Sequence, residues 1–342
     1  MTKTPVAVLG ATGAVGQQFV RLVHDHPTFA LAELVGSSSA GQRYGQAVDW
    51  IAPGDVPEAV RDETVLSTDA DLQAEAVFSA IPSSAARQLE PRLAKQGHAV
   101  FTNASAHRMD PDVPLVVPDV NPDHLDLVAD RDGFLVANPN CSAIVAVTPL
   151  KPLLDEHGLR RVDVVTLQAL SGAGYPGVPS LDATANVLPR IGGEEDKIET
   201  EPCKILGRRE ADSITHRDLS VSATATRVPV PEGHTIVLHL DLADDATPED
   251  VAHTLATYRP PEQVADLAAS PEQVIRVTDD PDRPQPRRDT YVDDGMGVTV
   301  GRVREDPTGT VKLVCLGSNT VRGAAGCSVM NAELAVERDY LG

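Results

Sequence analysis

One cysteine of this chain stands where a nucleophile could be formed. Cys141 follows Asn138-Pro139-Asn140 and precedes the apolar run "SAIVAVTPL", so the sequence places its thiol at or near the start of a helix. The partial positive charge of a helix N-terminus lowers the pKa of a thiol and favours the nucleophilic thiolate. We therefore expect Cys141 to be catalytic. Asn138 and Asn140 could cap the helix, contact a cofactor or do both, and the local sequence leaves these alternatives open.

The other three cysteines, Cys203, Cys315 and Cys327, lack such a setting. Cys315 lies in the apolar stretch "VKLVCLG" and Cys327 in the last predicted helix, so we expect both to be small buried side chains. The four cysteines form no CxxC pair. The sequence therefore predicts no metal site and no disulfide framework.

Chemistry on a thiolate needs a second side chain that can move protons. His234 lies in "TRVPVPEGHT", in a Pro/Gly turn between two predicted strands, so its imidazole could project into a cleft and exchange protons near neutral pH. His107 and His216 remain candidates on sequence alone. A thiolate beside a dinucleotide site could attack a carbonyl or acyl phosphate and exchange hydride with a nicotinamide.

The N-terminal segment "TPVAVLGATGAVGQQFVRLVHDHP" predicts the site for that nicotinamide cofactor. It has the pattern of a strand, a glycine-rich loop and a helix with apolar residues at helical spacing. The glycines permit a tight turn and a close approach to a pyrophosphate, which would lie at the helix N-terminus. We expect cofactor contacts from Gly10, Thr12, Gly13, Ala14, Val15 and Gly16.

The end of the next predicted strand, in "ALAELVGSSSAGQRYG", indicates which cofactor is bound. An NAD-specific fold usually places an acidic residue there, to bind the ribose 2′-hydroxyl. This chain has Gly36-Ser37-Ser38-Ser39 instead, with Arg43 nearby, and three hydroxyls with a cation suit a 2′-phosphate. We therefore predict NADP, bound by the three serines. The alternative is a Ser/Gly loop with no cofactor role, since Glu33 lies inside the strand.

The order of predicted elements indicates the fold class. Strand candidates at 76–84 and 98–105 end in small polar residues, and the carboxyl ends of parallel strands form a ligand crevice, so Ser83 and residues 103–105 are candidate contacts. Ordinary turn chemistry explains these residues equally well. After residue 150, strand patterns in "RRVDVVTLQAL", "LSVSATATRVPV", "HTIVLHLDL" and "VTVGRVRED" alternate with helical segments, which predicts an α+β domain with a mainly antiparallel sheet.

We thus expect an α/β protein of more than one domain. The predicted division is a Rossmann-like NADP-binding domain over residues 1–138, a catalytic domain over 139–318, and a C-terminal helix within 319–342 that packs back on the first domain. The Pro/Arg segment "PDRPQPRRDT" (281–290) is predicted to be a loop.

Composition limits the partners and the compartment. A net charge of -21, with only six lysines among 342 residues, argues against nucleic acid or an anionic membrane as a partner. The sequence shows no long apolar run and no signal peptide, so we expect a cytoplasmic protein. The acidity predicts a halophilic protein in a salt-rich cytoplasm, where counterions screen the self-repulsion. An ordinary acidic protein is the alternative.

Six segments carry a resemblance to a known family. They are "GATGAVG" at the N-terminus, "NASAHRMDPDVPLVVPDVNPDHL" (103–125), "NPNCSA", "LQALSGAGYPG" (167–177), "RVPVPEGHT" and "NTVRGAAG" (319–326). In this order and spacing the chain resembles the archaeal and fungal branch of the aspartate-semialdehyde dehydrogenases over nearly its whole length.

The resemblance implies roles for single residues. Cys141 would be the acyl-thioester nucleophile and His234 the acid/base catalyst, with backbone amides at the helix start stabilising the oxyanion. Gln168 would orient the acyl intermediate and Arg227 would bind the substrate α-carboxylate. Since seven residues separate Arg227 from His234, the intervening "PVPEG" turn must reorient one of the two side chains. Implied contacts on the nicotinamide side are Ser171, Gly172 and Asn319.

The same resemblance places Arg108 on the substrate phosphate, with a lysine from "GGEEDKIETEPCKILG". Glu194, Lys197, Glu201 and Lys204 share one helical face of that segment, although Pro202 could kink the helix and a solvated charged stripe is an alternative. We favour Glu194 and Lys197 as substrate contacts and keep Glu201 and Lys204 as alternates.

The implied reaction is the NADPH-dependent reduction of L-aspartyl-4-phosphate to L-aspartate-4-semialdehyde, in lysine, threonine and methionine biosynthesis, by a homodimer or homotetramer. N-acetylglutamyl-phosphate reductase and a malonyl-CoA reductase-like enzyme are the competing enzymes, because one methylene contributes only about 1 to 3 kcal/mol of discrimination. A non-catalytic NADP-binding module is a further alternative, disfavoured because both Cys141 and His234 are present.

Overall fold

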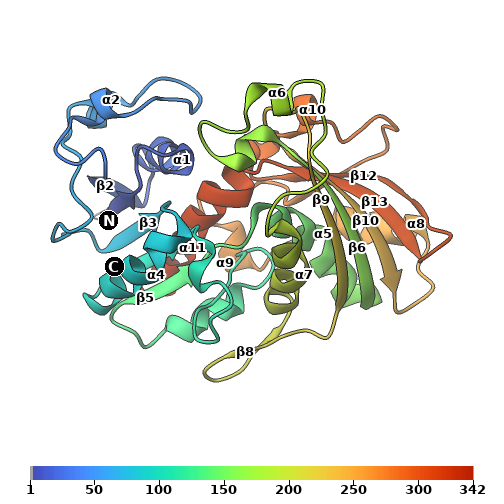
Figure 1. Cartoon of the computed structure of the whole chain (residues 1–342). Helices are drawn as coiled ribbons and strands as arrows, with labels where there is room; N and C mark the ends of the chain where they lie inside the picture. Colours follow the sequence, from blue (N-terminus) through green and yellow to red (C-terminus); the bar gives the residue numbers. More distant parts are fainter. Residues whose placement is uncertain (1–2, 342) are drawn as a thin grey trace.

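The computed structural model describes residues 3–341, and its first half is built on a five-stranded parallel sheet (Figure 1). The strand order is β2-β1-β3-β4-β5, with β1 (Thr4–Leu9), β2 (Phe29–Val35), β3 (Ala76–Ser79), β4 (Ala99–Thr102) and β5 (Phe134–Ala137). The strands β3 and β4 are shorter than predicted because the polar residues after them already belong to loops or to the next helix. Within residues 3–341, every helix is too short or too polar to cross a membrane.

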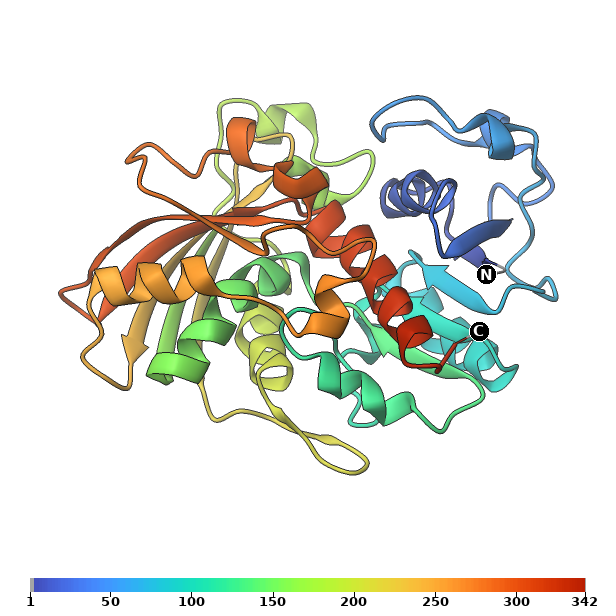
Figure 2. The same cartoon turned by 180° about the vertical axis from the view of Figure 1, so that it is seen from behind.

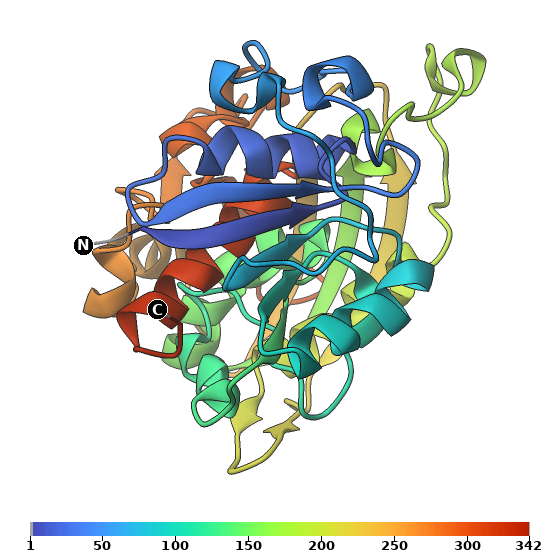
Figure 3. The ribbon, with the colours of Figure 1, turned by 90° about the vertical axis from the view of Figure 1, so that its left-hand side faces the viewer.

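Helices cover both faces of this sheet (Figure 3). Because side chains alternate along a strand, Val6 and Val8 of β1 face one core while Ala7 and Leu9 face the other. The first core contains all five phenylalanines of the chain, and Phe19 stacks on Phe78 with ring centroids 4.9 Å apart. The helices of this half are α1 (Ala14–Val23), α2 (Tyr44–Ala47), α3 (Glu58–Arg61) and α4 (Ser83–Lys95), with 3₁₀ turns η1 (Ser105–His107) and η2 (Pro122–Val128).

The second half is built on a six-stranded sheet of order β11-β12-β13-β10-β6-β9. Its strands are β6 (Leu159–Gln168), β9 (Ser220–Arg227), β10 (His234–Leu242), β11 (Ile275–Thr278), β12 (Val298–Glu305) and β13 (Val311–Gly317). Three of the five pairings are antiparallel, whereas β6 with β9 and β11 with β12 are parallel. The predicted fold class is confirmed, although the second sheet is more mixed than the sequence indicated.

The helices α5, α7 and α8 pack together against this sheet, while alternate side chains of β6 and β10 on the opposite face are partly exposed. The remaining elements are α5 (Cys141–His157), η3 (Leu170–Ala173), α6 (Ser180–Ala183), α7 (Glu194–Ile205), β7 (Arg208–Arg209), β8 (Ile214–Thr215), α8 (Pro248–Thr257), α9 (Glu262–Ala265), α10 (Pro286–Asp289) and η4 (Val292–Gly295). The segment 281–290 is therefore not entirely loop. The turn α10 forms there because buried Asp289 accepts hydrogen bonds from Arg283 and the backbone of Gln285.

The chain ends with a π-helical turn, η5 (Val321–Ala325), and α11 (Gly326–Glu337), which packs against α1 and β4 (Figure 2). Arg322 of η5 is fully buried. Its guanidinium donates to Asp119 Oδ2 at 2.5 Å, in the first half of the chain, and to Thr148 Oγ1 at 2.9 Å, in α5. This one side chain thus joins three segments that are far apart in the sequence.

We expect Arg322→Met to lower the free energy of unfolding by about 3 to 5 kcal/mol, because it leaves the Asp119 carboxylate buried without its partner. Asp119→Leu should have a similar cost, and the double variant should lose clearly less than the sum, because the pair acts as a unit. Urea unfolding measures all three variants.

The matched control is Lys151→Met, which breaks the partly exposed pair with Asp155, and it should cost less than about 1 kcal/mol. Additive single losses, or a loss for Arg322→Met as small as that of the control, would show that the buried pair does not hold the segments together.

Candidate active site

The helix α5 starts at Cys141 because Asn140 caps it. The Asn140 side-chain oxygen accepts the N–H groups of Ser142 at 3.0 Å and Ala143 at 3.2 Å, while its own N–H donates to the Glu201 carboxylate. Asn140 is therefore the N-cap, which decides one alternative that the sequence left open. The amides of Asn140, Ser142 and Ala143 already have partners, so among the amides at the helix start the Cys141 N–H stays the candidate for stabilising an oxyanion.

Asn138 has a different task from Asn140. Its amide nitrogen donates to Asn103 Oδ1 at 2.7 Å and to the Ala324 carbonyl at 3.2 Å, so it ties the loop after β4 to the C-terminal segment. Next to Ala324, Gly323 lies directly on the nucleophile, because a Cβ there would be 2.7 Å from the Cys141 Cβ. The last segment of the chain therefore forms one wall of the site.

The thiol of Cys141 faces the imidazole of His234. Cys141 Sγ lies 3.3 Å from His234 Nε2, and the other ring nitrogen, Nδ1, accepts the N–H of Ala169 at 3.1 Å. That hydrogen bond favours the tautomer with its proton on Nε2, next to the sulfur. Gly172 lies against the same ring, since a Cβ there would be 2.9 Å from His234 Cε1.

The protonation states differ from the sequence-based expectation for Cys141. Burial, followed by the negative charge of Glu194, raises the pKa of the Cys141 thiol to about 12, although Arg108 and the Ser142 amide act in the opposite direction. Burial, followed by the positive charge of Arg227, lowers the pKa of His234 to about 3. The expected lowering of the thiol pKa by the helix N-terminus is thus outweighed, and the ligand-free pair is a neutral thiol beside a neutral imidazole.

Three strand ends position the groups around this pair. Arg227 ends β9, Gln168 ends β6 and His234 begins β10, and because β6 lies between the other two strands the three residues are lateral neighbours at one sheet edge. Arg227 donates to the Ala169 carbonyl at 2.7 Å and to Gln168 Oε1 at 3.4 Å. The seven-residue separation is thus compatible with a shared site, because the turn after Arg227 starts a new strand.

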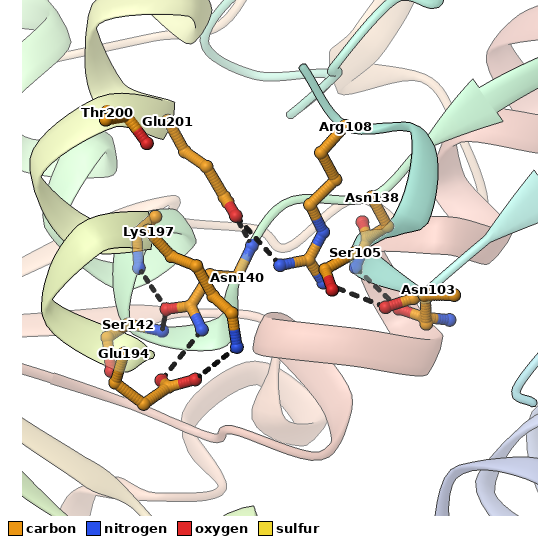
Figure 4. A network of polar contacts seen from close by, with 12 residues as sticks. Asn103, Ser105, Arg108, Asn138, Asn140, Ser142, Glu194, Lys197, Thr200 and Glu201 are labelled. Atoms are coloured by element: carbon orange, nitrogen blue, oxygen red, sulfur yellow. Dashed lines mark hydrogen bonds and ion pairs between the residues drawn. The ribbon is translucent and has the colours of Figure 1, made fainter. Parts of the chain in front are cut away.

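The charged face of α7 lies against the start of α5 (Figure 4). Glu194 accepts from the amide groups of Asn140 at 2.8 Å and Gln168 at 3.3 Å, and it pairs with Lys197 at 2.7 Å. Glu194 is mostly buried, whereas Lys197 is about one-third exposed, and both line the cavity at Cys141. Pro202 does not break α7, so all four charged residues keep one face.

The alternates Glu201 and Lys204 lie deeper than Glu194 and Lys197. Glu201 is buried, with one carboxylate oxygen 2.9 Å from Arg108 Nη1 and the other 2.5 Å from the backbone nitrogen of Asn140, which donates to it. Lys204 is fully buried and donates to the carbonyls of Arg108, Asp110 and Val113 at 2.7 to 2.8 Å. Because all three ammonium protons have backbone partners, Lys204 has no donor left for a substrate.

A cavity of about 300 Å³ lies over the thiol, lined by residues of both halves of the chain, among them Ser83, Asn103, Arg108, Asn140, Cys141, Ser171, Gly172, Lys197 and Asn319. Two buried donors at this cavity, Arg108 Nε and Asn103 Nδ2, have no hydrogen-bond partner. An unpaired buried donor is costly unless a ligand accepts from it. Together with Lys197, these donors suit an anionic group close to Cys141.

The glycine-rich loop fits a dinucleotide. Gly10 has φ +81°, and a Cβ there would be 2.8 Å from the Ala80 carbonyl oxygen; a Cβ at Gly16 would be 2.1 Å from Gly10 O. Gly13 is the N-cap of α1 and offers no side-chain oxygen, so the first amides of that helix remain free for phosphate. Gly10, Thr12 and Gly13 line a second cavity, of about 660 Å³, and Ala14 and Val15 line cavities nearer to Ser171.

The residues after β2 differ in whether they line the second cavity. Ser37 and Ser38 are exposed and line the second cavity, but Ser39 is buried beneath the loop and does not. Arg43 pairs with Asp62 at 2.8 Å and also lies outside the lining. The expectations for Ser39 and Arg43 are therefore not supported, because the loop turns both away from the crevice.

The other expected cofactor contacts lie where the two halves of the chain meet. Ser83 starts α4, and its hydroxyl lies 2.9 Å from the Ser105 hydroxyl. Asn319 donates to Ser171 Oγ at 2.8 Å and accepts the Gly233 N–H at 2.9 Å. Of the other histidines considered, His107 pairs with Asp110 and is not brought to the cavity.

Three residues contribute to the two cavities or to the groups beside them although the sequence did not indicate them: Ala169, Gly323 and Arg92. Ala169 acts through its backbone, which carries no residue-type signal, and Gly323 lies inside the quoted "NTVRGAAG" without being singled out. Arg92 lines the second cavity from α4. No feature of the local sequence singles it out.

Comparisons with known proteins agree with this arrangement. Residues 5–128 match the family profile "Semialdehyde dehydrogenase, NAD binding domain", and residues 150–322 match "Semialdehyde dehydrogenase, dimerisation domain". The chain is 48% identical to an aspartate-semialdehyde dehydrogenase of Archaeoglobus fulgidus (98% of this chain, 99% of the relative) and 41% identical to that of Saccharomyces cerevisiae (99% of each). It is similar to the crystal structure of aspartate semialdehyde dehydrogenase with NADP from Candida albicans, with TM-score 0.93, 38% identity and 99% of each chain covered.

The raised thiol pKa predicts how the ligand-free protein reacts with iodoacetamide. The alkylation rate of Cys141 should rise about tenfold per pH unit from pH 7 to 9 without a plateau, because the thiolate fraction is still small there. Mass spectrometry of the labelled peptide measures the rate, and Cys141→Ala shows the background from Cys203. A plateau above about pH 7 would mean that the helix N-terminus does lower the thiol pKa.

Proposed function

Because this chain belongs to the aspartate-semialdehyde dehydrogenase family, we propose that it catalyses the NADPH-dependent reduction of L-aspartyl-4-phosphate to L-aspartate-4-semialdehyde, with release of phosphate. The observation that carries the proposal is the position of the Cys141 thiol, 3.3 Å from His234 Nε2. The thiol lies in a cavity that also contains unpaired hydrogen-bond donors suited to an anion. The product would enter the aspartate pathway of lysine, threonine and methionine biosynthesis, in the cytoplasm.

Cys141 carries the acyl group in the proposed mechanism. Its Sγ forms a bond to the acyl carbon, the bond from that carbon to the phosphate oxygen breaks, and phosphate leaves with the electron pair. The glycine-rich loop would hold NADPH, which when bound would supply the hydride for reduction of the resulting thioester. The carbon–sulfur bond then breaks and returns the thiolate, which releases the aldehyde.

His234 handles the protons at Nε2, the ring nitrogen that faces the sulfur. In the tautomer that Ala169 favours, Nε2–H donates to the thiolate or to an oxyanion beside it. For Nε2 to accept the thiol proton, the ring must first be in the other neutral tautomer, with its proton on Nδ1. In that tautomer the hydrogen bond from the Ala169 N–H to Nδ1 is lost. The low pKa of His234 therefore favours rapid return of that proton to the leaving groups.

The remaining side chains bind the substrate. Arg227 binds the α-carboxylate of the substrate and Gln168 orients the acyl group. Glu194 accepts a hydrogen bond from the substrate amino group. Arg108 and Lys197 bind the phosphate, which the unpartnered Arg108 Nε supports. Glu201 is assigned a positioning role, because its carboxylate already holds Arg108 and Asn140.

The proposed NADP contacts follow the glycine-rich loop and the boundary between the two halves of the chain. They are Gly10, Thr12, Gly13, Ala14, Val15, Ser37, Ser38, Ser83, Ser171, Gly172 and Asn319, with Gly16 permitting the close approach of α1 to the loop. We also propose domain limits at 138/139 and 318/319, supported by the end of β5 at Ala137 and of β13 at Gly317.

The reverse reaction tests the proposal. Purified protein with NADP and phosphate should form NADPH from L-aspartate-4-semialdehyde at least about 100-fold faster than from N-acetylglutamate semialdehyde or malonate semialdehyde, measured at 340 nm as kcat/KM. Cys141→Ala should abolish turnover while still binding NADPH, and Cys203→Ala is the matched control with full rate. Preference for another semialdehyde would assign one of the competing reductases, and full activity of Cys141→Ala would reject the thioester mechanism.

The acidic surface and the assembly are proposed together. We propose a homodimer or homotetramer, supported by the similarity to a dimerisation domain and by the exposed apolar side chains Val165, Leu181 and Val187 in that half of the chain. We further propose that the protein is halophilic. The chain has 50 acidic and 29 basic residues, and the excess negative charges repel one another unless salt screens them.

A potassium chloride series tests both points. Between about 0.05 and 2 M salt the specific activity should rise severalfold and light scattering should show a stable oligomer, since the screening length falls from about 14 to 2 Å. Sucrose of equal osmolarity is the control. Maximal activity below about 0.2 M salt would identify an ordinary acidic enzyme, and a monomer at every concentration would exclude the oligomer.

A further inference from the structure

The second cavity lies where the adenosine half of a dinucleotide would bind, beside the glycine-rich loop. It extends from the glycine-rich loop across the end of β2, at Ser37 and Ser38, to the outer turns of α4. The strand end offers two exposed hydroxyls and no carboxylate. A 2′-phosphate placed there would need a cation, and the loop that carries the serines does not supply one.

The two charged residues suggested by sequence position are occupied elsewhere. Arg43 is in an ion pair with Asp62 and does not line the cavity. Glu33 of β2 accepts the backbone N–H groups of Gln73 and Ala74 at 3.0 to 3.1 Å, so its carboxylate is turned to the neighbouring loop. Neither residue can therefore distinguish a 2′-phosphate from a 2′-hydroxyl.

Arg92 does line the cavity, from the third turn of α4. Its Nη2 donates to the Thr68 carbonyl at 2.7 Å, which holds the guanidinium at the cavity, and its Nη1 is 3.4 Å from the Asp69 carboxylate. Among the cavity-lining residues of the described chain, Arg92 is the only cation. The pair with Asp69 is weak, because the Arg92 side chain is 46% exposed to water and the Asp69 side chain 85%.

We propose that Arg92 binds the 2′-phosphate of NADP and determines the preference for NADP over NAD. A phosphate monoester carries between about 1.5 and 2 negative charges near pH 7 and fits the planar guanidinium in a bidentate manner, so it competes well with an exposed Asp69. Ser37 and Ser38, which line the same cavity, complete the subsite with hydroxyl donors. The proposal rests on the proposed NADP-dependent function and specifies which side chain distinguishes NADP from NAD.

The test compares Arg92→Met with Arg43→Met by isothermal titration calorimetry at one fixed salt concentration, with NADPH and NADH as ligands. Methionine keeps a long unbranched stem and is a good helix former, so α4 should be retained. Arg92→Met should bind NADPH about 10- to 100-fold more weakly and NADH unchanged, since only the charge-assisted contacts to phosphate are lost. Arg43→Met should bind both as the wild type does.

A second variant separates charge from geometry. Arg92→Lys should recover part of the NADPH affinity, because it restores the charge but not the bidentate fork. An equal loss of NADPH and NADH affinity in Arg92→Met would indicate contact with the adenine and overturn the proposal, as would unchanged NADPH binding or a selective loss in Arg43→Met. If the wild type bound neither cofactor, the proposed function itself would fail.

Discussion

The buried ion pair between Arg322 and Asp119 holds together the parts that make the site. Asp119 belongs to the first half of the chain, Thr148 to the nucleophile helix α5, and Arg322 to the π-helical turn before α11. A π-helical turn is often found where backbone geometry serves a site, and here it brings Gly323 onto the Cys141 side chain. An ion pair shielded from water is strongly directional, so it sets the relative position of the three segments more precisely than apolar packing alone.

Around the thiol, opposite charges are arranged so that the ligand-free site stays nearly neutral. Arg108 is paired with Glu201, and Lys197 with Glu194, while Arg227 donates to a backbone carbonyl next to His234. The neutral thiol and imidazole fit this balance, because burial disfavours any further charge. An anionic substrate changes the balance, since it brings the negative groups for which Arg108 Nε and Asn103 Nδ2 have free donors.

The helix α7 shows how one spacing serves two purposes. One face of the helix carries four charged residues, which lie at different depths. Glu194 and Lys197 line the cavity. The more deeply buried Glu201 and Lys204 hold Arg108, Asn140 and the loop 108–113 in place by hydrogen bonds. Two further carboxylates of α7, Glu195 and Glu199, accept backbone N–H groups of β9 and so anchor the helix to the sheet.

The sequence by itself determined the glycine-rich loop with its strand and helix, the helix start at Cys141, the candidate histidine and the fold class, because these depend on local residue order and on periodic burial. It could not determine the protonation of Cys141, since exclusion of water and the charge of Glu194 come from segments far along the chain. Nor could it distinguish Arg92 from Arg43, or Lys197 from Lys204. Those choices depend on which groups face the same cavity, and only the tertiary structure, which brings α4, α7 and the C-terminal turn around the two crevices, decided them.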